Sequence, residues 1–138
     1  SVMEWLMWQM GGLGPMAGQA HHFRQSMGGE DVPYGVERYS NEVRRLYGVM
    51  DKRLTEAEWL GGDDYSIADM ACWPWARSSR RQGVDKAELP SVKRWFDAMS
   101  ERPGVQMGME LLADKRGSKA MTPESRDLLF GAGQFERE

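Results

Sequence analysis

The chain has 138 residues, of which 41% are hydrophobic and 28% charged, and its net charge is −3 at pH 7. This length suits one domain with a buried core, and the lack of excess positive charge argues against nucleic-acid binding. The single cysteine, Cys72, can form no disulfide within the chain and offers no zinc-ligand spacing, which favours a reducing cytoplasm. No apolar run approaches the ~20 residues of a membrane span.

The first ten residues, SVMEWLMWQM, are expected to begin an apolar helix. Ser1 and Glu4 have the spacing of a capping box, and Glu4 stands where a signal peptide would need basic residues. Because a helix starts at the first residue, without an initiator methionine, we expect the chain to be a fragment of a longer protein.

The next stretch, GGLGPMAGQAHHF (residues 11–23), could be a phosphate loop, a metal site or a helix break. A phosphate loop would need a preceding strand and a terminal Lys-Ser or Lys-Thr, which are missing. His21 and His22 are adjacent and point about 100° apart on a helix, so no metal site is predicted. The glycines and Pro15 instead predict a break that lets a neighbouring helix or a ligand approach the backbone.

A long helix is predicted from Pro33 to about Leu54. Apolar residues recur there in steps of three and four and form one stripe: Val36, Tyr39, Val43, Leu46, Met50 and Leu54. The opposite face is polar and carries Tyr34, Arg38, Asn41, Glu42 and Arg45.

The following segment, YSIADMACWPW, predicts a capped helix. Ser66 and Asp69 form a Ser-x-x-Asp capping box, flanked by a hydrophobic staple of Tyr65 and Met70. Pro74 should kink this helix, which is expected to end near Gly83.

The remaining predicted helices run from Pro90 to about Arg102 and from Val105 to Leu112. The rest is polar, with a possible helical turn at residues 123–130. No strand pattern is present, so the predicted fold is an all-α bundle of about five helices at residues 1–112, followed by a polar tail at residues 113–138.

Most of the six tryptophans and eleven methionines are expected in the core, because they occur at helical spacing. The expected exceptions flank the glycine stretch or Pro74: Trp5, Trp8, Met10, Met16 and Trp75. Cys72 is expected to be buried and inert. No catalytic pattern is evident, so residue types and spacing alone leave the function open.

Two stretches resemble a known family. YSIADMACWPW resembles the capped helix at the centre of the C-terminal domain of glutathione transferases. EWLMWQMGGLGPMAGQAHHF, followed by PYGVERY, is similar to the nu-class bacterial glutathione transferases, which are disulfide-bond reductases, and to the related yeast nitrogen-regulator-like branch. The similarity covers roughly Met3 to Met107.

The resemblance implies an all-helical domain that completes a substrate pocket beside an N-terminal thioredoxin-like domain, in a dimer that holds two glutathione molecules per active site. It implies that Arg38, in the ERY triplet, binds glutathione and that the first helix lines the pocket floor. The expected pocket-lining residues are Trp8, Met10, Gly11, Gly14, Met16, Tyr34 and Trp75. Ser66 and Asp69 are expected to be structural, and no residue is assigned to catalysis or to a metal.

The thioredoxin-like domain is absent from these 138 residues, which leaves two interpretations. In the first, the chain is the pocket-forming half of a glutathione-dependent enzyme, inactive by itself and acting on a small thiol or disulfide. In the second, it is a stand-alone helical interaction module without catalysis.

Overall fold

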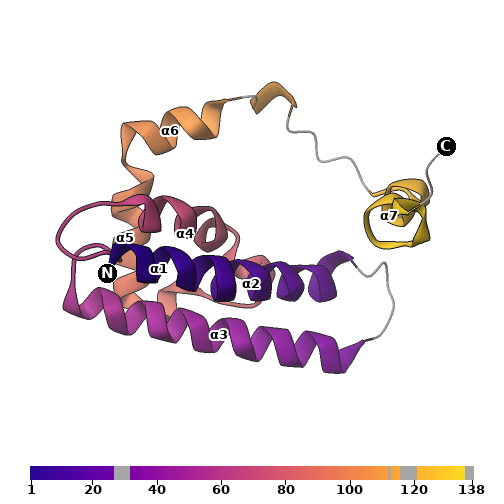
Figure 1. Ribbon diagram of the computed structural model, residues 1–138, viewed down its shortest axis with the longest axis horizontal. Coiled ribbons are helices and arrows are strands. Elements are labelled where there is room, and N and C mark those ends of the chain that lie inside the picture. Colours follow the sequence, from indigo (N-terminus) through magenta and orange to yellow (C-terminus); the bar gives the residue numbers. More distant parts are fainter. Residues whose placement is uncertain (27–31, 112, 116–120, 136–138) are drawn as a thin grey trace. The chain divides into compact units, whose positions relative to one another are not determined.

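The computed structural model describes residues 1–26, 32–111, 113–115 and 121–135, which are helical with short connections (Figure 1). They fall into two compact units, Ser1–Gln106 and Met107–Glu138. The all-α prediction is confirmed, since no β-strand occurs in the described ranges. None of the described helices is long and apolar enough to cross a membrane.

The first unit is built from five α-helices and the start of a sixth, joined by short π and 3-10 turns. The α-helices are α1 (Val2–Trp8), α2 (Gly14–His21), α3 (Pro33–Glu56), α4 (Ile67–Arg77), α5 (Pro90–Ser100) and α6 (Pro103–Glu110), which continues into the second unit. The turns are η1 (Gln9–Leu13), η2 (His22–Ser26), η3 (Ser79–Gln82) and η4 (Lys86–Glu88). The second unit contains η5 (Ala113–Lys115), α7 (Pro123–Phe130) and η6 (Ala132–Gln134).

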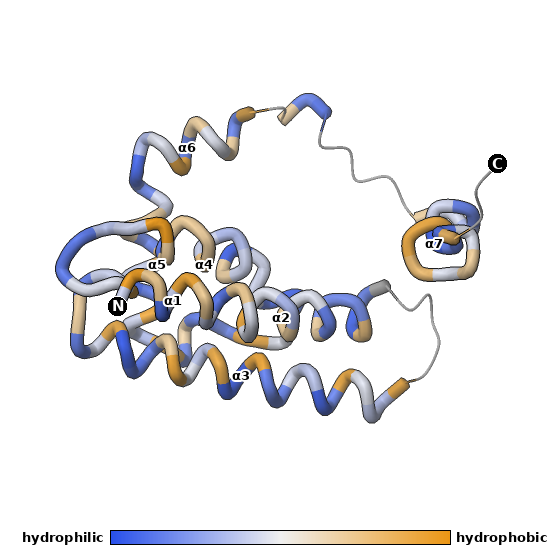
Figure 2. The backbone as a smooth tube through the Cα atoms, viewed as in Figure 1, coloured by the Kyte–Doolittle hydropathy of each residue, from blue (hydrophilic) through white to orange (hydrophobic). Residues whose placement is uncertain are grey.

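The core of the first unit lies where α2, α3, α4 and α5 pack together. The alternation of apolar and polar residues along α3 is visible in Figure 2. The predicted stripe is confirmed, because Val43, Leu46, Met50 and Leu54 are buried. The fully buried side chains that meet α3 include Leu13, Cys72, Val92, Trp95 and Met99.

The helix break predicted at residues 11–15 is wrong. The chain stays helical through η1, a π-helical turn, and continues directly into α2. This widened turn lies immediately before Pro15, which has no N–H group to donate to the carbonyl of Gly11. The Ser1–Glu4 capping box is also wrong, because the Ser1 hydroxyl donates to the carbonyl of Gly61 at 2.7 Å.

The capping box of α4 is confirmed and is part of a larger buried network. The Asp69 carboxylate accepts hydrogen bonds from the backbone N–H and the hydroxyl of Ser66, at 3.0 and 3.1 Å. It also accepts from the N–H of Leu60 at 2.9 Å and from the indole Nε1 of Trp95 at 2.8 Å. Asp69 is fully buried, so one carboxylate joins the start of α4, the loop before it and α5.

α4 ends earlier than predicted, at Arg77 rather than near Gly83. Two side chains from the following segment donate hydrogen bonds to backbone carbonyls in the last turn of α4. Gln82 Nε2 donates to the carbonyl of Trp75 at 2.9 Å, and Lys86 Nζ donates to the carbonyl of Ala76 at 2.8 Å. Gly83 instead ends η3, with φ at +84°, a backbone conformation that favours glycine.

The start of α5 is capped by a residue of another helix. Leu89, at the N-cap position, makes no side-chain cap. The Asp51 carboxylate of α3 accepts from the backbone N–H groups of Ser91 and Val92, both at 2.9 Å. These bonds attach α5 to the C-terminal part of α3.

Candidate functional site

The polar face of α3 forms one side of an open pocket in the first unit. Side chains separated by three or four residues lie on the same face of a helix, so the polar face noted in the sequence becomes one continuous surface. The pocket has a volume of about 430 Å³ and is lined by Tyr34, Glu37, Arg38, Asn41, Glu42 and Arg45.

Two charged groups in this pocket are already paired with each other. Arg45 donates from Nε and from a terminal nitrogen to the two carboxylate oxygens of Glu42, both at 2.8 Å. The hydrogen bonds from Arg45 lower the pKa of the Glu42 carboxyl, and the nearby charge of Arg38 acts in the same direction. Glu42 is therefore held as a carboxylate by the fork geometry of Arg45.

Arg38 is exposed on the same face. An Arg38–Glu42 ion pair, the ordinary explanation for an exposed arginine, is wrong because Glu42 is engaged by Arg45. Across the described ranges, Arg38 has no side-chain hydrogen bond or ion pair. Tyr34, one turn earlier, is 76% exposed. The Arg38 guanidinium and the Tyr34 ring are thus accessible to a ligand, alongside the exposed Glu37 and Asn41 of the same face.

The other residues expected to line a pocket do not line this one. Gly14 is buried, and a Cβ atom there would lie 3.3 Å from Trp75 Nε1 and 2.6 Å from Gln9 Nε2. The glycine therefore permits close contact with a neighbouring helix, one of the two reasons considered from the sequence. Trp8, Met16 and Trp75 are half-buried and pack against the core.

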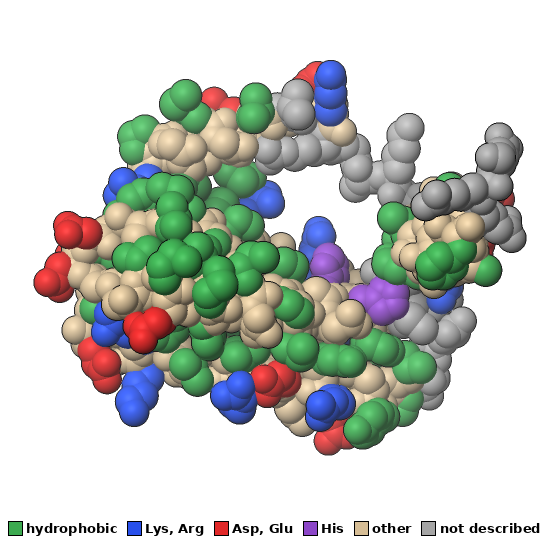
Figure 3. Space-filling model, in the orientation of Figure 1, with side chains coloured by type: hydrophobic (Ala, Val, Ile, Leu, Met, Phe, Trp, Pro, Cys, Tyr) green, Lys and Arg blue, Asp and Glu red, His purple; other side chains and the backbone are tan. Residues whose placement is uncertain are grey.

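The exposed residues of the first helical segment form a methionine face. Met3, Met7 and Met10 are 60, 52 and 59% exposed, and Gly11 is also exposed. Hydrophobic side chains gather over α1 in Figure 3. Contiguous apolar surface of this kind is typical of an interface.

Sequence reasoning missed a second pocket, which lies after α4. It is lined by Arg77, Ser78, Arg80, Arg81 and Lys86. The available signal was the run RSSRR at residues 77–81. That run alone does not show that Lys86 lines the same pocket. Lys86 reaches the pocket only because the chain turns back at η3.

Residues 33–103 match the family model described as glutathione S-transferase, C-terminal domain. Disulfide-bond oxidoreductase YfcG of Escherichia coli is 47% identical over 119 residues, which cover 86% of this chain and 54% of that protein. A glutathione transferase homologue from Lodderomyces elongisporus, solved with two glutathione molecules per subunit, superposes with a TM-score of 0.74 at 36% identity, covering 80% of this chain and 52% of the other.

The nitrogen regulation fragment of the yeast prion protein Ure2p superposes with a TM-score of 0.73 at 38% identity, covering 79% of this chain and 52% of the fragment. These matches agree with the two branches that the sequence resembles. The chain spans about half the length of these relatives. The matched model covers all of α3, α4 and α5, and the chain therefore belongs to the glutathione S-transferase C-terminal domain family.

Proposed function

We propose that this chain is the helical, substrate-pocket half of a glutathione-dependent transferase or disulfide-bond reductase, and that Arg38 binds a carboxylate of glutathione. The observation that carries the proposal is the unpaired Arg38 in a pocket where the neighbouring Glu42 and Arg45 pair with each other. All six residues that line this pocket belong to α3, so it is an open hollow of about 430 Å³ on the surface of one helix.

The chemistry of the ligand matches the groups available. Glutathione carries two carboxylates, and a planar guanidinium can hold one of them through two parallel hydrogen bonds. The Glu42–Arg45 pair already satisfies part of its own hydrogen-bonding capacity, which leaves Arg38 as the arginine of this face without such a pair. Tyr34 adds an exposed ring and hydroxyl one turn away.

The catalytic groups that orient the glutathione thiol are expected in a thioredoxin-like domain rather than in this chain. The proposal draws on two relatives of which this chain spans about half, one named a disulfide-bond oxidoreductase and the other solved with two glutathione molecules per subunit. The proposed parent is a cytoplasmic homodimer that acts on a small thiol or disulfide.

The direct test compares the chain alone with a parent in which it follows a thioredoxin-like domain. Glutathione-dependent reduction of a small disulfide is measured for both proteins. We expect turnover only in the parent, because this chain supplies binding residues and no thiol-activating group. Turnover by the chain alone, or no turnover by the parent, would contradict the proposed division.

A second expected result concerns the methionine face of Met3, Met7 and Met10. If this face covers a partner domain or subunit in the parent, the isolated chain should self-associate at high concentration. Sedimentation velocity should show this association, and Met3→Gln/Met7→Gln/Met10→Gln should remove it. The control Met107→Gln changes a methionine that is 70% exposed and lies outside the face. This variant should associate as strongly as the unsubstituted 138-residue chain. A chain that stays monomeric at every concentration would count against a missing partner.

A further inference from the structure

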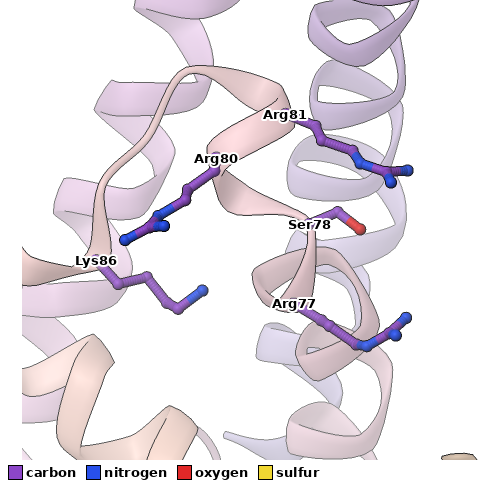
Figure 4. Close-up of a pocket in the computed structure, with 5 residues that line it drawn as sticks. All are labelled: Arg77, Ser78, Arg80, Arg81 and Lys86. Carbon is purple, nitrogen blue, oxygen red and sulfur yellow. The ribbon is translucent and has the colours of Figure 1, made fainter.

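The second pocket is formed where the chain turns back after α4. Its volume is about 280 Å³, and its lining combines three arginines, one lysine and Ser78. Figure 4 shows Arg80 extending toward the side of Lys86, while Arg77, Ser78 and Arg81 extend on the opposite side of the segment. The four cationic side chains thus line the pocket in two groups, which leave the segment in different directions.

Among the residues that the structure describes, no acidic side chain lines this pocket. The nearby carboxylates that act on Lys86 are engaged elsewhere: Asp85 accepts from the N–H of Ala87 at 3.0 Å, and Asp97 pairs with Lys93. Arg77, Arg80 and Arg81 are exposed, and none has a side-chain hydrogen bond or ion pair across residues 1–26, 32–111, 113–115 and 121–135. Asp85 and Asp97 offset part of the charge of Lys86, and the three arginines carry the rest of the positive charge at this pocket.

Lys86 is held in place rather than free in solvent. Its ammonium group donates to the carbonyl of Ala76 at 2.8 Å and to the hydroxyl of Ser79 at 3.0 Å, and it lies 4.1 Å from the centroid of the Phe96 ring. Burial, followed by the charge of Arg80, lowers the pKa of Lys86. The repulsion between Arg80 and Lys86 is one that a bound anion would relieve.

We propose that this pocket binds a small, multiply charged phosphate compound, such as pyrophosphate or a phosphomonoester. Arginine forks match phosphate oxygens bidentately, and lysine adds a compact charge. The volume lies below the ~300–1,000 Å³ usual for drug-sized ligands, so the charged group itself is the part that fits. The pocket shares no lining residue with the α3 pocket, and the inference does not depend on glutathione binding.

Isothermal titration of pyrophosphate into the 138-residue chain, at constant ionic strength, tests the proposal. We expect saturable binding at one site, weakened at least tenfold by Arg80→Gln/Arg81→Gln and at least threefold by Arg77→Gln. The matched control Lys52→Gln/Lys115→Gln removes two exposed charges outside the pocket and should change the affinity less than twofold. Circular dichroism of each variant checks that the helices are intact.

Competition titrations identify the recognised group. Inorganic phosphate and glycerol phosphate should displace pyrophosphate, whereas succinate should bind at least tenfold more weakly than the phosphomonoester. The proposal is overturned by absent saturation, by equal losses in both double variants, or by succinate binding as tightly as the phosphomonoester. If glutathione displaced pyrophosphate, the claim that the phosphate site is separate from the α3 pocket would be wrong.

Discussion

Replacing Asp69 with alanine is expected to lower the free energy of unfolding by about 3–7 kcal/mol, since a lost cap costs ~1 kcal/mol and each stranded buried donor ~1–3 kcal/mol. Two donors are stranded in this case, the backbone N–H of Leu60 and the indole N–H of Trp95. The side chain is fully buried, so water cannot replace the carboxylate without opening the core. Urea denaturation monitored by circular dichroism measures the loss.

Two further variants separate the contributions. Ser66→Ala removes only the cap and should cost about 1 kcal/mol. Asp69→Asn keeps an acceptor for Leu60 and Trp95 but places an amide NH2 against the N–H of Ser66, so its stability should fall between those of Ser66→Ala and Asp69→Ala. An Asp69→Ala midpoint close to that of the original chain would mean that the network does not stabilise the fold.

Replacing Arg38 with alanine is expected to weaken binding of glutathione disulfide by the two-domain parent by about 1.5–3 kcal/mol, the range for hydrogen bonds to charged groups. The loss should be close to this intrinsic value, because Arg38 has no side-chain partner in the described part of the chain whose release would complicate the measurement. Calorimetric titration gives the affinity directly.

The control variants test geometry against charge. Arg38→Lys restores the charge without the planar fork, so its affinity should be intermediate. Lys52→Ala removes an exposed charge farther along α3 and outside the pocket, and its affinity should match that of the parent. Equal affinities for all four proteins would return Arg38 to the role of a solvated surface residue.

The helical elements that were predicted well are those whose signals are local. The stripe of α3 and the Ser66–Asp69 box each lie within one segment, and both are confirmed. The helical turn at residues 123–130 is confirmed for the same reason, as α7 with Thr122 at its N-cap. Periodicity and capping chemistry are properties of neighbouring residues, so they can be read without the rest of the fold.

The parts that were missed depend on residues far apart in the chain. The end of α4 is set by Gln82 and Lys86, which come after the helix and fold back onto its carbonyls. The hydrogen bonds that Asp69 accepts from Leu60 and Trp95 likewise need the loop and α5 to be in place. At the candidate site the missed feature is local instead: the sequence indicated the polar face of α3, but not that Glu42 pairs with Arg45, three residues later on the same helix.

The capping of α5 by Asp51 has a consequence for the order in which the chain folds. The two hydrogen bonds that Asp51 accepts span 40 and 41 residues, and an isolated helix as short as α5 is marginal in water. Since its N-terminal N–H groups find their side-chain acceptor on α3, α5 gains full stability only after α3 has formed and docked. Closing that long loop carries an entropic cost before any contact compensates for it, so α5 becomes stable together with the core and not ahead of it.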